Sequence, residues 1–102
     1  AVRLKLNLVV LILNDNSFGM IRWKQYAAGY EDFGLEFNNP DFVMYANSYG
    51  ATGHRVESVD SFIPLIDRCY EQGGVHLIEL PVDYSENNRV LIDELKERVC
   101  II

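Results

Sequence analysis

The stretch "NLVVLILNDNSFGM", residues 7–20, decides the fold. Its first half is rich in Val, Ile and Leu without polar alternation, which is typical of a strand covered on both faces in a parallel sheet. The run stops at Asn14-Asp15-Asn16, and the segment from Ser17 to Ala28 then reads as a helix. Ser17 is the expected N-cap, and Gly29 ends the helix.

Downstream of this stretch, helical and strand patterns alternate. The expected helices have punctuation at both ends, with Pro40 at the first position of one and Gly50 after it. The expected elements are a loop over 30–39, helices over 40–49, 60–72 and 87–99, and strands over 53–58 and 75–80. Such alternation predicts a three-layer α/β/α domain with a parallel sheet and right-handed crossovers.

The opening segment "AVRLKL", residues 1–6, has helical spacing but no capping residue. We interpret it as the tail of a helix that begins outside the chain. Residues 1–102 are therefore expected to form the C-terminal portion of a single, incomplete domain.

Composition narrows the classes of partner. The 102 residues carry 9 Lys and Arg against 15 Asp and Glu, a net charge of -6. Without a basic stripe, we expect no nucleic acid and no membrane as partner. No stretch approaches the roughly 18 apolar residues of a membrane span. A bound phosphate compound would need a metal ion or backbone amides.

The cysteines and histidines show no metal-binding spacing. Cys69 and Cys100 form no C-x-x-C pair and do not cluster in sequence with His54 or His76. We therefore expect neither a disulfide nor a zinc framework, structural roles for both histidines, and a cytoplasmic location.

The Asn-Asp-Asn turn has two interpretations. Such residues are common in strand-to-helix turns, but ligands of α/β sheets also bind beyond the carboxyl ends of strands. In the second case the Asp15 carboxylate and the Ser17 carbonyl could hold Mg²⁺, and N–H groups near Gly19 and Met20 could face a diphosphate. Trp23 fits a core or a pocket wall equally.

Three longer stretches carry a family resemblance: "NLVVLILNDNSFGMIRWKQ", "EFNNPDFVMYANSYGATGHRVES" and "LIELPVDYSENNRVL". They resemble acetolactate synthases of the catabolic type and, more broadly, the C-terminal diphosphate-binding domain of thiamine-diphosphate enzymes. The resemblance covers nearly all of residues 1–95.

The resemblance implies thiamine diphosphate and Mg²⁺ as cofactors. It makes Asp15 the closing residue of the metal motif and the Ser17 carbonyl the next ligand, while the opening Asp would precede Ala1. The backbone of Phe18, Gly19 and Met20 would touch the cofactor, and Met20 would border the substrate pocket. The biosynthetic members of the family carry a pocket Trp four residues after this methionine; here that position is Lys24, and the nearest Trp is Trp23.

The implied reaction condenses two pyruvates to 2-acetolactate with loss of carbon dioxide. Family members take the catalytic Glu from a separate N-terminal domain, usually of a second subunit, so no catalytic residue lies in this chain. The implied partners are therefore the rest of its own polypeptide and a second subunit, in a homodimer or homotetramer. We expect the 102-residue chain alone to be inactive.

Several alternatives stay open from the sequence. Pyruvate oxidase, glyoxylate carboligase and 2-keto acid decarboxylases share this domain. FAD could occur in the full-length protein, in a middle domain, but would not be bound by this region. A non-catalytic α/β binding or signalling module is a further alternative, although the additional acidic pair and the Lys of phospho-acceptor domains are not found.

Overall fold

The computed structural model describes residues 1–94, apart from the side chains of Asn88, Leu91 and Ile92. Its elements are β1 (Leu8–Asn14), α1 (Gly19–Ala27), α2 (Phe42–Ser48), β2 (Thr52–Arg55), α3 (Val59–Gln72), β3 (Val75–Pro81) and the π-helix η1 (Asn88–Asp93). They form two compact units. The sheet unit comprises Ala1–Asn14 and Asn39–Pro81, and the loop unit comprises Asp15–Asn38 and the chain from Val82.

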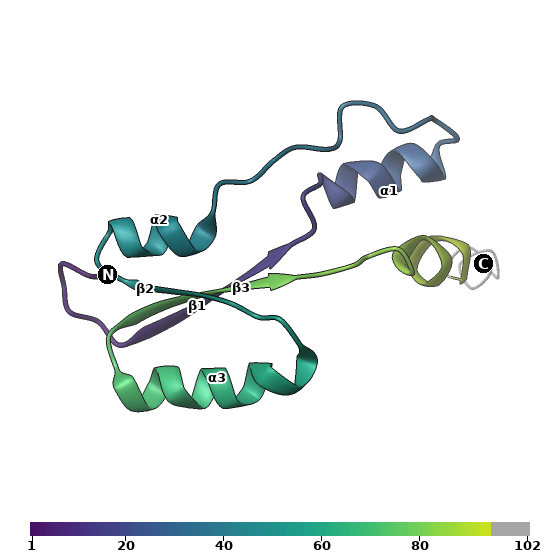
Figure 1. Cartoon of the computed structure of the whole chain (residues 1–102). Helices are drawn as coiled ribbons and strands as arrows, with labels where there is room; N and C mark the ends of the chain where they lie inside the picture. The colour runs from purple at the N-terminus through teal and green to yellow at the C-terminus, as the bar shows by residue number, and fades with distance from the viewer. Residues whose placement is uncertain (95–102) are drawn as a thin grey trace. The chain divides into compact units, whose positions relative to one another are not determined.

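The sheet unit contains three parallel strands in the order β1-β3-β2. Leu8 pairs with Val75 at one end of β1 and Asn14 with Pro81 at the other, so β1 and β3 run in step over seven residues. Figure 1 shows α2 and α3 on opposite faces of this sheet. The expected α/β class with a parallel sheet is thereby confirmed.

The core of the sheet unit lies between α3 and β3. Its buried centre is formed by Leu65, Cys69 and Ile78. The half-buried side chains packed against it are Val9, Val56, Phe62, Ile66 and Leu80. Residues 7–14 were expected to form a strand that is buried on both faces. β1 is instead an outer strand of the described sheet, and its Leu11 and Leu13 are exposed. The strand whose side chains are buried on both faces is β3.

The starts of α2 and α3 differ from those expected from the sequence. Asp41 caps α2, since its side chain accepts hydrogen bonds from the N–H groups of Val43 and Met44. α3 begins after Ser58 and contains Pro64 beyond its first turn. Tyr70, in the last turn of α3, is exposed.

The chain ends also differ from expectation. Residues 2–5 form a turn rather than the tail of a helix. The helix expected over 87–99 is present as η1, and its last residues, 95–99, lie outside the described part. Within the described part, no helix is both long and apolar enough to cross a membrane.

The loop unit is organised around α1 and the segment that follows it. An isolated bridge pairs Ser17 with Glu36, and Phe18 N–H donates to the carbonyl of Leu35 at 3.0 Å. Phe18 and Phe37 stack with ring centroids 4.6 Å apart. These contacts fold residues 35–37 back along the start of α1.

Candidate functional site

Asp15 follows directly on the last residue of β1 and shapes the turn into α1. Its Oδ1 accepts a hydrogen bond from the N–H of Ser17 at 3.1 Å. Asn16 has a φ of 54°, in the left-handed region that Asn tolerates better than most residues. Oδ1 of Asp15 thus stabilises the turn, while Oδ2 takes no part in this hydrogen bond.

The second oxygen of Asp15 lies beside the first residue of α1. A Cβ at Gly19 would stand 3.2 Å from Asp15 Oδ2, so the absence of a side chain permits this approach. The N-cap residue is Phe18, not Ser17 as expected, and it supplies no side-chain hydrogen bond to the helix. The first-turn N–H groups of α1 therefore lack the cap that Asp41 and Ser58 give to α2 and α3.

Asp15 lines two hollows within the loop unit. One has a volume of about 380 Å³ and is lined by Asp15, Asn16, Ser17, Arg22, Glu36, Phe37 and Asn38. The other has a volume of about 420 Å³ and is lined by Asp15, Gly19, Arg22, Trp23, Val82, Asp83, Tyr84 and Ser85. Asp15 and Arg22 belong to both hollows.

Some of the expected site residues line the two hollows and others do not. Asp15 and Ser17 share the first hollow, whereas Asp15, Gly19 and Trp23 share the second. Trp23 also packs edge-on against Tyr84 at 6.2 Å. Phe18 packs on Phe37, and Met20 is exposed and lines neither hollow.

Two polar groups distinguish the first hollow. The Ser17 hydroxyl is buried and has no hydrogen-bond partner among the described residues. Arg22 forms ion pairs with Asp32 at 3.2 Å and with Glu36 at 3.3 Å. Arg22 was not predicted as a site residue, although its position three residues after Gly19 puts both on one side of α1.

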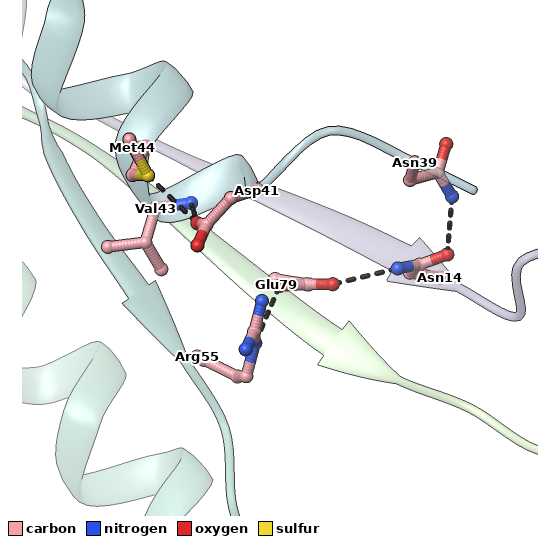
Figure 2. A network of polar contacts seen from close by, with 7 residues as sticks. All are labelled: Asn14, Asn39, Asp41, Val43, Met44, Arg55 and Glu79. Carbon is pink, nitrogen blue, oxygen red and sulfur yellow. Dashed lines mark hydrogen bonds and ion pairs between the residues drawn. The ribbon is translucent and has the colours of Figure 1, made fainter.

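A separate polar network joins the carboxyl ends of the three strands in the sheet unit (Figure 2). Glu79 of β3 is buried, and its two oxygens accept from Asn14 Nδ2 at 2.7 Å and from Arg55 Nε at 2.8 Å. The Glu79 hydrogen bond and charge raise the pKa of the Arg55 guanidinium. Asn14 Oδ1 accepts from Asn39 Nδ2 at 2.7 Å, so the residue before Asp15 is held at both ends of its amide.

The sheet unit also brings His54, Cys69 and His76 together in space, although they do not cluster in sequence. Cys100 lies outside the described residues. The spacing in sequence gave no signal, because the cluster depends on the register between β2 and β3, in which Thr52 pairs with His76.

Residues 1–80 match the family model of the thiamine pyrophosphate enzyme, C-terminal TPP binding domain. An acetolactate synthase of Bacillus subtilis is 38% identical over 95 residues, covering 93% of this chain and 17% of that protein. A catabolic acetolactate synthase of Raoultella terrigena is 33% identical over 87 residues, which cover 85% of this chain and 16% of that protein.

A relative with a different printed activity also matches. A probable 2-ketoarginine decarboxylase of Pseudomonas aeruginosa is 33% identical over 73 residues, covering 72% of this chain and 13% of that protein. The chain thus spans about a sixth of the length of the curated relatives it matches.

Proposed function

Since this chain belongs to the family of C-terminal TPP binding domains of thiamine pyrophosphate enzymes, we propose that it is part of an acetolactate synthase. Such a protein condenses two pyruvates to 2-acetolactate with loss of carbon dioxide. The proposal is supported by acetolactate synthases among its relatives, two of them at 38% and 33% identity. The 2-ketoarginine decarboxylase favours a second candidate, decarboxylation of another 2-keto acid.

The share of this region in the proposed reaction is to anchor the diphosphate through Mg²⁺. Asp15 Oδ2 and the Ser17 carbonyl are the proposed ligands, since Mg²⁺ prefers oxygen and uses one or two carboxylates together with phosphate oxygens. The observation that carries the assignment is the approach of Asp15 Oδ2 to Gly19, which brings an anionic ligand to the start of α1.

Two features of the loop unit fit a metal-bound diphosphate. The buried Ser17 hydroxyl, without a partner among the described residues, can donate to a phosphate oxygen. The first-turn N–H groups at Gly19 and Met20, which no side chain caps, favour an anion at this helix start, whereas the N–H of Phe18 already donates to the Leu35 carbonyl. When bound, thiamine diphosphate supplies the nucleophilic carbon and accepts the electrons released by decarboxylation.

The remaining roles are proposals of the same kind. Trp23 walls the hollow that it shares with Asp15 and Gly19. Met20 is exposed and lines neither hollow, so its proposed place beside the substrate is supported by the family resemblance alone. The activating glutamate, any flavin and the rest of the metal motif would come from outside this chain, from the remainder of its polypeptide or a second subunit. Residues 1–102 would then be the C-terminal portion of a larger cofactor-binding domain.

The decisive variant is Asp15→Asn in the intact protein that carries this chain. Loss of a metal ligand should weaken thiamine diphosphate binding by about 100-fold or more at fixed Mg²⁺. Even mutation of a residue that only hydrogen-bonds to a metal ligand lowers metal affinity by about 10–100-fold. Isothermal titration measures the affinity, and acetolactate formation from pyruvate should fall with it.

Asp67→Asn is the matched control, because it removes the same charge from an exposed carboxylate of α3 that lines neither hollow. It should leave cofactor affinity near that of the parent. Near-normal cofactor saturation in Asp15→Asn would refute the metal assignment. Release of an aldehyde without acetolactate by the parent protein would favour the decarboxylase.

A further inference from the structure

Three elements of the sheet unit bring potential metal ligands to one point. His54 comes from β2, Cys69 from α3 and His76 from β3. His54 Nε2 lies 3.0 Å from His76 Nδ1 and 3.6 Å from Cys69 Sγ. The three ligand atoms all lie within 4.8 Å of one another.

The orientation of His76 is set by a backbone carbonyl. Its Nε2 lies 2.8 Å from the carbonyl oxygen of Gly73, which can only accept, so Nε2 carries the proton. The lone pair of Nδ1 therefore faces His54. Metal-bound histidines almost always donate their other ring N–H to a carbonyl, a carboxylate or water, which fixes tautomer and ring position in this way.

Two of the three ligand separations are close to those of a tetrahedral zinc site. Zn–N bonds of ~2.05 Å and Zn–S bonds of ~2.3 Å place two nitrogen ligands ~3.35 Å apart and nitrogen from sulfur ~3.55 Å apart. The observed separations of 3.0 and 3.6 Å differ from these by a few tenths of an ångström or less. The separation of His76 Nδ1 from Cys69 Sγ is at most 4.8 Å, and side-chain rotation on metal binding would have to set it near the same ~3.55 Å.

The environment favours a ligand role for Cys69 over a nucleophilic one. Cys69 and His76 are 1% and 2% exposed, so neither can meet a substrate in solution. Burial also raises the pKa of the Cys69 thiol, which disfavours the free thiolate, so a metal ion would have to displace the thiol proton before the sulfur could bind it. Burial, with the nearby His76 and Arg68, lowers the pKa of His54, whose neutral imidazole is the form that binds metals.

His54 gives the cluster its access to solvent. A pocket of about 310 Å³ opens at its side chain and is lined by His54, Arg55, Glu57, Ser58, Ser61, Leu65 and Arg68. The pocket can supply the entry path and a fourth ligand. Its charged groups have both signs, with Glu57 offsetting part of the positive charge of Arg55 and Arg68.

We propose that His54, Cys69 and His76 form a binding site for a borderline-soft divalent transition-metal ion, Zn²⁺, with water from the pocket as the fourth ligand. On binding, the Cys69 thiol releases its proton to solvent and the sulfur bonds to the metal. The His54 proton moves to Nδ1, so one proton leaves for each ion and no electron is transferred. The site shares no residue with the proposed Mg²⁺ site, and its set of two nitrogens and one sulfur disfavours Mg²⁺.

The experiment is a Co²⁺ titration of the intact protein after removal of metals by a chelator. We expect one equivalent to produce the visible bands of tetrahedral Co²⁺ and a near-ultraviolet thiolate-to-cobalt band, both abolished by Zn²⁺ and unaffected by Mg²⁺. Cys69→Ser should remove the thiolate band, whereas Cys100→Ser, the control, should keep it.

His54→Leu provides a second arm, because its side chain is only half-buried and substitution there is less disruptive to the core. It should weaken Co²⁺ binding by about 100-fold while backbone hydrogen exchange in β3 stays protected. A parent protein without the thiolate band, or a band that survives in Cys69→Ser, overturns the proposal and leaves a hydrogen-bonded structural cluster. Neither readout involves thiamine diphosphate, so this result is separate from that of Asp15→Asn.

Discussion

The sheet unit and the loop unit hold their structures in different ways. The sheet unit has strands in register and a core of Leu65, Cys69 and Ile78 between α3 and β3. Among the described residues of the loop unit, Leu35 is the buried hydrophobic side chain, while Phe33 is 86% exposed and Tyr30 is 72% exposed. One unit is fixed by packing and the other mainly by turn and bridge hydrogen bonds.

This difference separates two kinds of residue. Substitutions in the sheet unit should change stability, because closely packed and buried groups tolerate little change. The proposed cofactor residues 15–20 belong to the loop unit, where the same substitutions should change stability little. Function and stability should therefore respond to different variants.

Gly53→Ala should have the largest effect on stability. A Cβ there would meet the backbone of α2 at Val43, with Cα and O both 2.6 Å away. Because a backbone cannot rotate away as a side chain can, we expect a loss of about 3 kcal/mol, the upper end for overpacking. Hydrogen exchange of peptides from α2 and β2 in the intact protein measures it, with the neighbouring, exposed Thr52→Ala as control. Unchanged protection in Gly53→Ala would show that α2 can move away from β2 freely.

Glu79→Ala should have an intermediate effect. It removes the acceptor of Asn14 and Arg55 from a buried position and leaves the Asn14 amide donor without that partner, at a cost of about 1–3 kcal/mol. Hydrogen exchange at the ends of β1 and β3 reports the loss.

Glu86→Ala tests the same chemistry in the loop unit. The Glu86–Arg89 and Glu79–Arg55 ion pairs are both 2.8 Å long, but the side chain of Glu86 is 73% exposed and that of Glu79 is 6% exposed. Solvent-exposed pairs contribute little, so Glu86→Ala should leave exchange unchanged. Equal effects of the two variants would contradict the contrast between the units.

Phe33→Ser should have the smallest effect. The ring is almost fully exposed, and its removal should shift stability by no more than about 0.5 kcal/mol. A thermal unfolding scan checks this. A marked destabilisation would show that Phe33 is covered in the intact protein, and the loop unit would then need packing as much as the sheet unit does.

The sequence was informative where a local pattern decides the structure. Apolar runs predicted β1 and β3, and Gly50 and Gly73 mark the ends of α2 and α3. The start of α1 was misplaced because the Asp15 carboxylate binds the N–H of Ser17 and delays the helix to Gly19.

Features that depend on distant pairing could not be predicted in this way. Asp15 was identified by its position after a strand, but its approach to Gly19 depends on the turn geometry. The meeting of His54, Cys69 and His76 depends on strand order and on the register of β2 with β3. Neither the approach of Asp15 to Gly19 nor the meeting of the three residues can be predicted from spacing along the chain.

The Asn14 amide has a direction, since its oxygen accepts from Asn39 and its nitrogen donates to Glu79. Deamidation would replace the amide nitrogen by an oxygen and leave the oxygen that accepts from Asn39 in place. A second carboxylate would then face that of Glu79, and the donor would be lost. Chemical ageing at Asn14 would therefore release the end of β1 directly before Asp15, a form of damage that adds only about one dalton to the mass of the protein.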